Sequence, residues 1–193
     1  MNPIETYKLK SGKTLEVHHD MEPPDPRKES DNLAVMVCFS RRYNLGDEHD
    51  YRAEDYNGWD ELEAAIIKKE NPAVIVPLFL YDHGSLRIKI GSFQGLLPQF
   101  HAEFDSSQVG FIFVPRQKVL DEWGVKRISP KLKATVENNL RVEVETYDDY
   151  LSGRVYGFVV KDADGEEADS CWGFYGSDLK ENGMLDQAGE ELA

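Results

Sequence analysis

Among the side chains that could do chemistry in this sequence, the carboxylates stand out by their number and by their uneven distribution. The 193 residues include 36 Asp and Glu against 22 Lys and Arg, a formal net charge of −14. Residues 141–193 hold fourteen acids and four bases, whereas residues 71–140 hold six acids and eight bases. Binding to nucleic acid or to an anionic membrane depends on Lys and Arg, so the sequence predicts neither. It favours a basic protein as partner. The alternative is that the acids serve only solubility.

A cluster of acids between 162 and 167 raises the question of a metal site. Asp162, Asp164 and Gly165 match part of a calcium-binding loop, but an EF-hand requires Gly at the sixth position and Glu at the twelfth. Here the glycine is the fourth residue. We interpret the segment as a turn with solvated acids and predict no metal site. Phosphate-binding glycine motifs are absent from the sequence, so we predict no cofactor.

Acid–base chemistry has one candidate pocket. A histidine whose pKa stays near neutrality can accept and donate protons, and a neighbouring carboxylate can orient it. Cys171 is not included, because it lies in an aromatic strand where a buried thiol is expected. The candidate pocket, which would define a small enzyme or ligand-binding domain, consists of Tyr81, Asp82, His83, Asp105 and Ser106.

The elements that must position these side chains follow from hydrophobic periodicity. Short links between the expected strands argue against β-α-β units. We therefore predict an α+β fold with a mostly antiparallel sheet and about three helices. It forms a single domain over residues 1–176, followed by an acidic, loosely helical tail over 177–193. Residues 41–57 are polar and predicted to be irregular. The expected strands are 5–9, 14–18, 33–39, 73–81, 86–90, 109–114, 155–160 and 170–175, and the expected helices are 59–69, 116–123 and 130–151.

The longest expected helix has its charges at the wrong ends. Lys131 and Lys133 lie in its first turn and acids crowd its last turn, and each placement costs ~0.3–1 kcal/mol at an exposed site. Helix stability therefore does not explain these acids, although screening by salt would reduce the cost. Residues 141–146 also alternate like a strand, which is the alternative for this segment. We hypothesise one anionic surface that joins the helix end to the following hairpin loop. It consists of Glu145, Asp148, Asp149, Asp162, Asp164, Glu166 and Glu167.

Compartment and redox state are suggested by what the sequence lacks. It has no run of ~18 apolar residues, and its polar N-terminus does not have the apolar core of a signal peptide. A cytoplasmic protein is therefore expected. In that compartment Cys38 and Cys171 are expected as two buried, reduced thiols.

Six stretches resemble a group of small, uncharacterised proteins carried by bacteriophages and other mobile elements. The resemblance covers about residues 77–176 and brings no known activity or site. It implies an accessory protein that works inside a bacterial host cell, where acidic single-domain proteins often inhibit nucleic-acid-targeting defences. The stretches are LYDH (80–83), DSSQVGFIFV (105–114), GVKRIS (124–129), VETYDDYL (144–151), VYGF (155–158) and DSCWGFYG (169–176).

Three hypotheses follow. The first is a non-enzymatic protein that binds and inhibits a basic, nucleic-acid-handling host protein through the anionic surface, by nucleic-acid mimicry. The second is a small enzyme or ligand-binding domain at the candidate pocket. The third is a structural or regulatory oligomer that uses Trp172, Phe174 and Tyr175 at its interface. The sequence leaves the oligomeric state and the identity of the partner open.

Overall fold

The computed structural model describes residues 2–97, 102 and 104–193. It confirms an α+β fold, with two four-stranded sheets in which every strand pair is antiparallel. The sequence predicts one domain over 1–176, and in the structure the chain segments group into two compact units. Unit 1 combines Met1–Pro26 with Asp149–Ala193, and unit 2 spans Arg27–Asp148.

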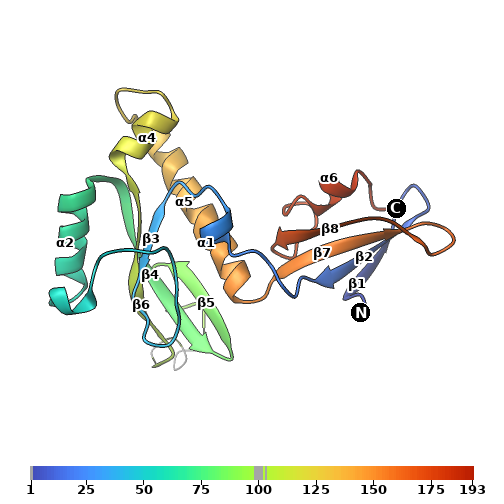
Figure 1. Ribbon diagram of the computed structural model, residues 1–193, viewed down its shortest axis with the longest axis horizontal. Helices are drawn as coiled ribbons and strands as arrows, with labels where there is room; N and C mark the ends of the chain where they lie inside the picture. The colour runs from blue at the N-terminus through green and yellow to red at the C-terminus, as the bar shows by residue number, and fades with distance from the viewer. Residues whose placement is uncertain (1, 98–101, 103) are drawn as a thin grey trace. The chain divides into compact units, whose positions relative to one another are not determined.

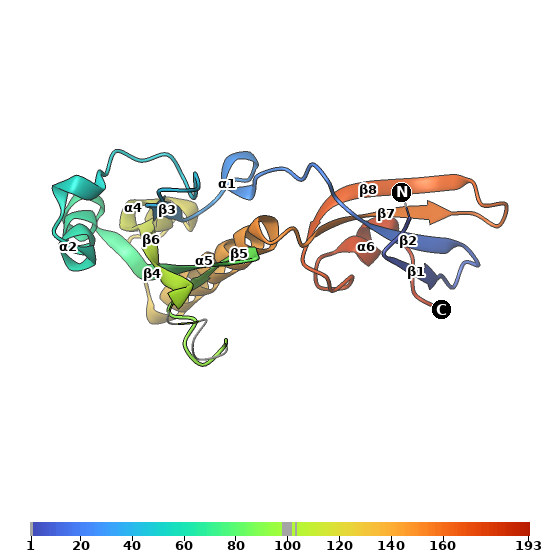
Figure 2. The same cartoon turned by 90° about the horizontal axis from the view of Figure 1, so that it is seen from below.

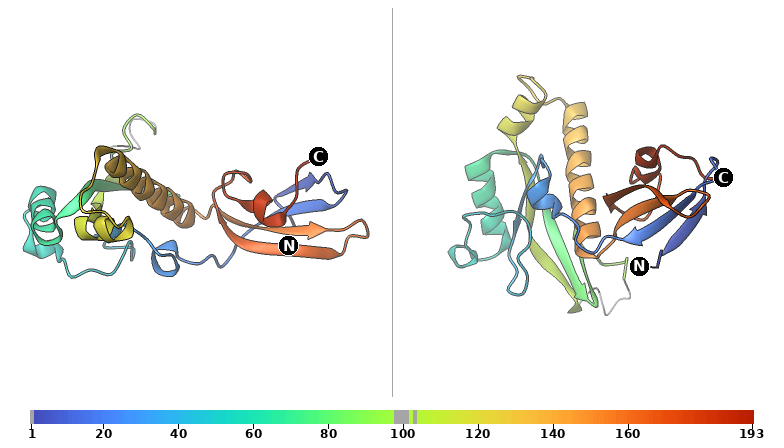
Figure 3. Two further views of the ribbon diagram at one scale, coloured as in Figure 1. Left: turned by 90° about the horizontal axis from the view of Figure 1, so that it is seen from above. Right: turned by 45° about the vertical axis from the view of Figure 1, so that its right-hand side comes forward.

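The sheet of unit 1 has β8 and β1 at its two edges (Figure 2). Its core lies on one face, where Leu15 and Phe158 are fully buried and the short helix α6 (Met184–Ala188) covers them (Figure 3). The β7–β8 hairpin forms as predicted. The strands in spatial order are β1 (Glu5–Lys8), β2 (Thr14–His19), β7 (Val155–Lys161) and β8 (Glu167–Tyr175).

The C-terminal segment 177–193 packs into unit 1, unlike the loose tail that composition suggests. Leu179, Met184 and Leu185 are buried in the core of this unit. At the very end, the Ala193 N–H donates to the Lys8 carbonyl at 2.9 Å. Apolar residues at irregular spacing among many acids hid this role, because no helical period links them.

The sheet of unit 2 is built around β4 and β6. Pro77 removes one donor from β4, and a register shift follows between Leu78 and Phe79, as expected of a proline inside a strand. Gly110 on β6 is required by a close approach, because a Cβ there would lie 1.9 Å from the Val37 carbonyl oxygen. The strands in spatial order are β3 (Val35–Cys38), β6 (Ser106–Pro115), β4 (Pro72–His83) and β5 (Ser85–Ile90).

Two helices lie on opposite sides of this sheet (Figure 1). Helix α2 (Trp59–Glu70) buries Leu62 and Ile66 against side chains of β3 and β6. Helix α5 (Pro130–Leu151) runs on the other side, and residues 141–146 are helical, which removes the strand alternative. Among the described residues, the other helical segments with defined bounds are α1 (Pro26–Glu29), the 3-10 turn η1 (Ala53–Asp55) and α4 (Arg116–Glu122).

The structure bears on two further expectations, one about membrane-spanning helices and one about the cysteines. Within the described residues, no helix combines the length and the apolar character that a membrane crossing needs. Both cysteines are free; Cys38 is buried as predicted, whereas Cys171, which was also expected to be buried, is half-buried.

Candidate functional site

Asp148 belongs to the interior of unit 2 and not to an anionic surface. The side chain is 7% exposed, and its two oxygens accept hydrogen bonds from Arg87, with Nε at 2.9 Å and Nη2 at 2.7 Å. The backbone N–H of Ile88 donates to the same carboxylate at 2.8 Å. This carboxylate therefore fixes the end of α5 to β5, which explains an acid where the helix dipole disfavours one. The partner lies 61 residues away in sequence, beyond the reach of a local pattern.

The other two acids at the end of α5 differ from each other. Asp149, in unit 1, accepts a hydrogen bond from Arg154 Nε at 2.7 Å, and its side chain is largely buried. Glu145, in unit 2, is exposed. Of the three acids that the sequence places at the helix end, only Glu145 is therefore exposed to solvent.

The loop between β7 and β8 is a turn, as interpreted, with Asp162 at its start. One oxygen of Asp162 accepts hydrogen bonds from the backbone N–H groups of Asp164 and Glu166, both at 3.0 Å. The Gly165 N–H donates to the Asp162 carbonyl at 3.2 Å, and its φ of +84° suits glycine. This carboxylate organises the turn.

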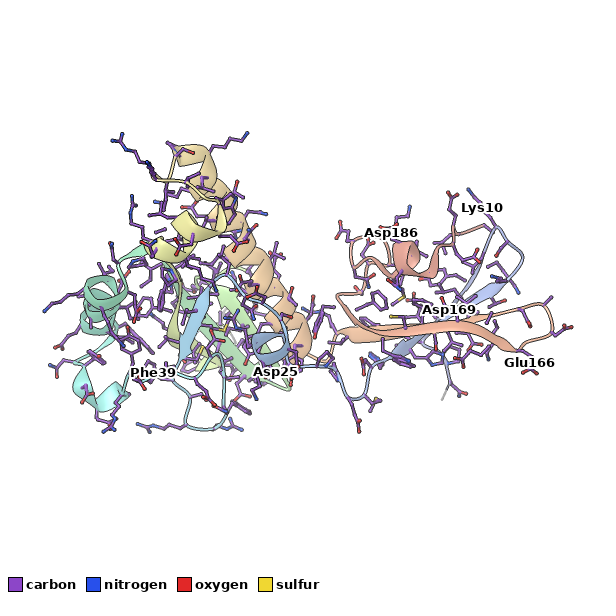
Figure 4. All side chains as sticks on the ribbon, turned by 45° about the horizontal axis from the view of Figure 1, so that its top comes forward. Lys10, Asp25, Phe39, Glu166, Asp169 and Asp186 are labelled. Atoms are coloured by element: carbon purple, nitrogen blue, oxygen red, sulfur yellow. The ribbon has the colours of Figure 1, made fainter. Side chains whose placement is uncertain are left out.

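The hairpin presents five acids, which we call the hairpin carboxylates. Asp169, which the sequence prediction did not include, extends the set along β8; Figure 4 shows it on that strand and Glu166 at the turn. No lysine or arginine within 2–97, 102 and 104–193 forms an ion pair with any of the five, and Lys161 binds Glu16 instead. The hairpin carboxylates are Asp162, Asp164, Glu166, Glu167 and Asp169.

Charge differs strongly between the two units. Unit 1 has sixteen acids and six bases, a net charge of −10, and unit 2 has twenty acids and sixteen bases, a net charge of −4. The unit with fewer residues therefore holds most of the excess negative charge. None of the hairpin carboxylates forms an ion pair among the described residues, and the same holds for scattered acids of this unit such as Glu22, Glu181 and Asp186.

The acid–base candidates come together at one end of the unit 2 sheet. His83 Nδ1 lies 3.3 Å from Asp105 Oδ2, and the rings of Tyr81 and His83 are 6.2 Å apart. Tyr81 also pairs with Ser106 across the β4–β6 ladder. Asp82 is engaged elsewhere, because its carboxylate binds Arg42 Nη1 at 2.6 Å.

The surroundings of this group differ from those of a proton-transfer site. The His83 side chain is 56% exposed, and the Ser106 hydroxyl donates to the Ala102 carbonyl. The group thus consists of paired side chains at an open sheet end, outside the pocket described next.

Sequence reasoning missed a pocket of about 1050 Å³ in unit 2, which we call the loop pocket. It is lined by residues between Cys38 and Leu62, from the end of β3 to the first turns of α2. The predicted irregular segment 41–57 forms most of its wall. The aromatic residues there recur without a period, so no sequence pattern indicated a site.

Buried polar contacts hold the loop that forms this pocket. The Gly46 N–H donates to the Tyr147 hydroxyl at 3.0 Å, and His49 Nε2 lies 3.1 Å from the Cys38 carbonyl oxygen. Asp47 binds the buried Arg27, with Nε at 2.8 Å, and also accepts from the Met36 N–H at 2.7 Å. The loop is therefore anchored to β3 and α5 at several points.

Electrostatics assign structural roles to Arg27 and Cys38. Burial disfavours the charge of Arg27, but hydrogen bonds to Asp47 and Glu143 outweigh burial and raise its pKa. Burial, with a contribution from Asp47, raises the pKa of the Cys38 thiol to about 12. A thiol with that pKa is protonated at neutral pH, so Cys38 is not an activated nucleophile.

In the described part of the chain no group of three or more His, Cys, Asp and Glu side chains is arranged to hold a metal ion. Comparisons with protein-family models, with curated proteins and with solved structures gave no match. The two surfaces that remain for functional interpretation are the hairpin carboxylates of unit 1 and the loop pocket of unit 2.

Proposed function

We propose that the protein is a non-enzymatic accessory protein of a phage or mobile element that binds and inhibits a basic, nucleic-acid-handling host protein. The observation that carries the proposal is the set of hairpin carboxylates, unpaired on the unit whose net charge is −10. The setting rests on the sequence resemblance to phage proteins. The protein acts in the cytoplasm of the bacterial host.

The hairpin suits a site that normally holds phosphates. Alternate residues of a strand lie about 6.5–7 Å apart. Glu167 and Asp169, two residues apart on β8, thus lie near each other, and the turn acids add negative charge next to them. A groove lined with Lys and Arg attracts such a group of charges as it attracts a nucleic-acid backbone.

An exposed aromatic residue on the same strand supports a protein partner. Trp172 is 47% exposed on β8, the edge strand that follows the acidic turn. Aromatic anchors are enriched at protein interfaces, whereas charged residues at the rim mainly steer association. The proposed contact surface is therefore the exposed edge of β8, which presents the hairpin carboxylates and, on the strand face opposite to Asp169, Trp172. It omits Asp148 and Asp149, which are committed to arginines within their own units.

The test compares two variants with equal charge changes in unit 1. D164N/E166Q/D169N neutralises three hairpin carboxylates, and E22Q/E181Q/D186N neutralises three exposed acids elsewhere in the unit. Each protein is immobilised and exposed to bacterial lysate, and retained proteins are identified and challenged with competing DNA. We expect the parent and the control variant to retain a basic nucleic-acid-binding protein that DNA releases, and the hairpin variant to lose it. Equal retention by both variants, or retention that DNA does not affect, would contradict the proposal.

A further inference from the structure

The loop pocket lies in unit 2 and is independent of the hairpin carboxylates. Its volume of about 1050 Å³ is at the upper end of the range for small-molecule sites. The aromatic side chains that face this space are only half-buried, and a bound ligand would remove more of their apolar surface from water. From the composition of its wall, we propose that this pocket binds an organic cation.

The wall is rich in aromatic rings from three neighbouring elements. Phe39, labelled in Figure 4, follows β3, and its ring centroid lies 6.2 Å from that of Trp59 at the start of α2. Tyr56, Tyr43 and the His49 imidazole complete this aromatic part of the lining, and the Tyr43 ring already carries the Arg42 guanidinium at 5.3 Å from its centroid. The face of an aromatic ring carries negative potential, so several rings around one space attract an ammonium or guanidinium group.

Carboxylates supply the second feature. Glu48 and Asp50 line the pocket and are exposed, and in the described part of the chain neither forms an ion pair. Asp47 also lines it but is neutralised by Arg27. Arg41 is a cationic lining residue, so the two free carboxylates leave an excess of negative charge.

This combination disfavours an anionic ligand. Unit 2 has a net charge of −4, and Asp60 and Glu61 occupy the first turn of α2 beside the pocket, where they oppose an anion at the helix N-terminus. An organic cation gains from both the rings and the carboxylates. Alkylammonium and guanidinium compounds are therefore the expected class.

The test uses Trp59 as reporter in the W123F/W172F protein, which keeps Trp59 as its single tryptophan. Fluorescence and calorimetric titrations with choline, arginine methyl ester and spermidine measure binding, and 3,3-dimethyl-1-butanol serves as the neutral isostere of choline. We expect saturable binding of at least one cation, and choline, if it binds, should do so roughly tenfold more tightly than its neutral isostere. Absence of saturable binding for all three cations, or equal affinity for choline and its isostere, would overturn the proposal.

Matched variants then locate the site. E48Q/D50N removes the two free carboxylates of the pocket, and D31N/E145Q makes the same charge change at exposed positions of unit 2 away from its lining. The first variant should weaken binding of the cation about fivefold to tenfold, and the control should leave it within twofold. An equal effect of both variants would show a general charge effect and would also overturn the proposal.

Discussion

Two sets of carboxylates, one in each unit of this protein, have different roles. In unit 2, Asp47 and Glu143 bind the buried Arg27, and Asp148 binds Arg87, so these acids join segments distant in sequence. In unit 1, the hairpin carboxylates have no basic partner among the described residues. The comparison shows that a local excess of acidic residues in a sequence can include acids with two different roles. Only contacts in three dimensions separate the acids that hold the fold from those available to a partner.

The largest loss of stability is expected when the buried cation of unit 2 is removed. Arg27→Met leaves two carboxylates without their shared cation, and removing one partner of a buried pair typically costs about 3–5 kcal/mol. Urea unfolding of the W172F protein, whose two remaining tryptophans lie in unit 2, measures this loss. Arg52→Met, at an exposed position, is the control. A loss below about 1 kcal/mol for Arg27→Met would show that the pair is not structural.

A smaller loss of stability should follow from substitution of Asp148, which the sequence assigned to the surface. Asp148→Asn keeps the shape but weakens the bonds from Arg87 and from the Ile88 N–H, so we expect the free energy of unfolding to fall by about 1–3 kcal/mol. Glu145→Gln on the same helix is exposed and should change it by less than about 0.5 kcal/mol. Equal effects in the same urea assay would erase the distinction between these acids.

Stability at alkaline pH tests the structural role of Cys38 in unit 2, because its thiol lines the loop pocket and has a raised pKa. The unfolded thiol loses its proton near pH 9.0, whereas the folded thiol keeps it up to a pKa of about 12. The unfolded state therefore binds fewer protons in this window, and the free energy of unfolding falls as pH rises, by about 1.4 kcal/mol per pH unit at most. Burial also raises the pKa of Tyr51, which adds to the slope with the same sign.

Cys38→Ala isolates the thiol from the tyrosine. Its unfolding free energy should show a shallower decline between pH 9 and 12 than that of the parent, and Tyr51→Phe should remove a separate part. Parallel pH profiles for the parent and Cys38→Ala would mean that the thiol is not buried as described.

The smallest effect on stability is expected in unit 1. Because the hairpin carboxylates lack ion pairs, D164N/E166Q/D169N should change the free energy of unfolding by less than about 0.5 kcal/mol. Fluorescence of Trp172 during urea unfolding reports on this unit. A loss above about 1 kcal/mol would place these acids with the structural ones of unit 2.

Much of the fold could be predicted from the sequence, because apolar runs and turn residues act locally. The prolines and glycines around α2, α5 and the β7–β8 hairpin define their ends, and the observed bounds differ from the predicted ones by only a few residues. The division into two units was not predicted, since it depends on the N-terminal hairpin pairing with β7 across more than 130 residues. Such a pairing leaves no periodic trace in the sequence.

Prediction of the site was less complete. Four acids of the predicted surface lie on the hairpin, where the turn chemistry of Asp162 and Gly165 is visible in sequence. The commitment of Asp148 to Arg87 was not visible, because a buried ion pair between distant segments depends on tertiary packing. The loop pocket was missed for a related reason: its wall is an irregular segment held by contacts to Arg27 and Tyr147.

The most direct test of the distinction between structural and available acids is the affinity of the retained host protein for the two triple variants. With that protein purified, titration against the parent, D164N/E166Q/D169N and E22Q/E181Q/D186N gives three dissociation constants at matched salt. We predict at least a tenfold weakening for the hairpin variant with an unchanged unfolding curve, and less than a threefold change for the control. Equal affinities of the two variants, or a loss of binding accompanied by unfolding of unit 1, would contradict it.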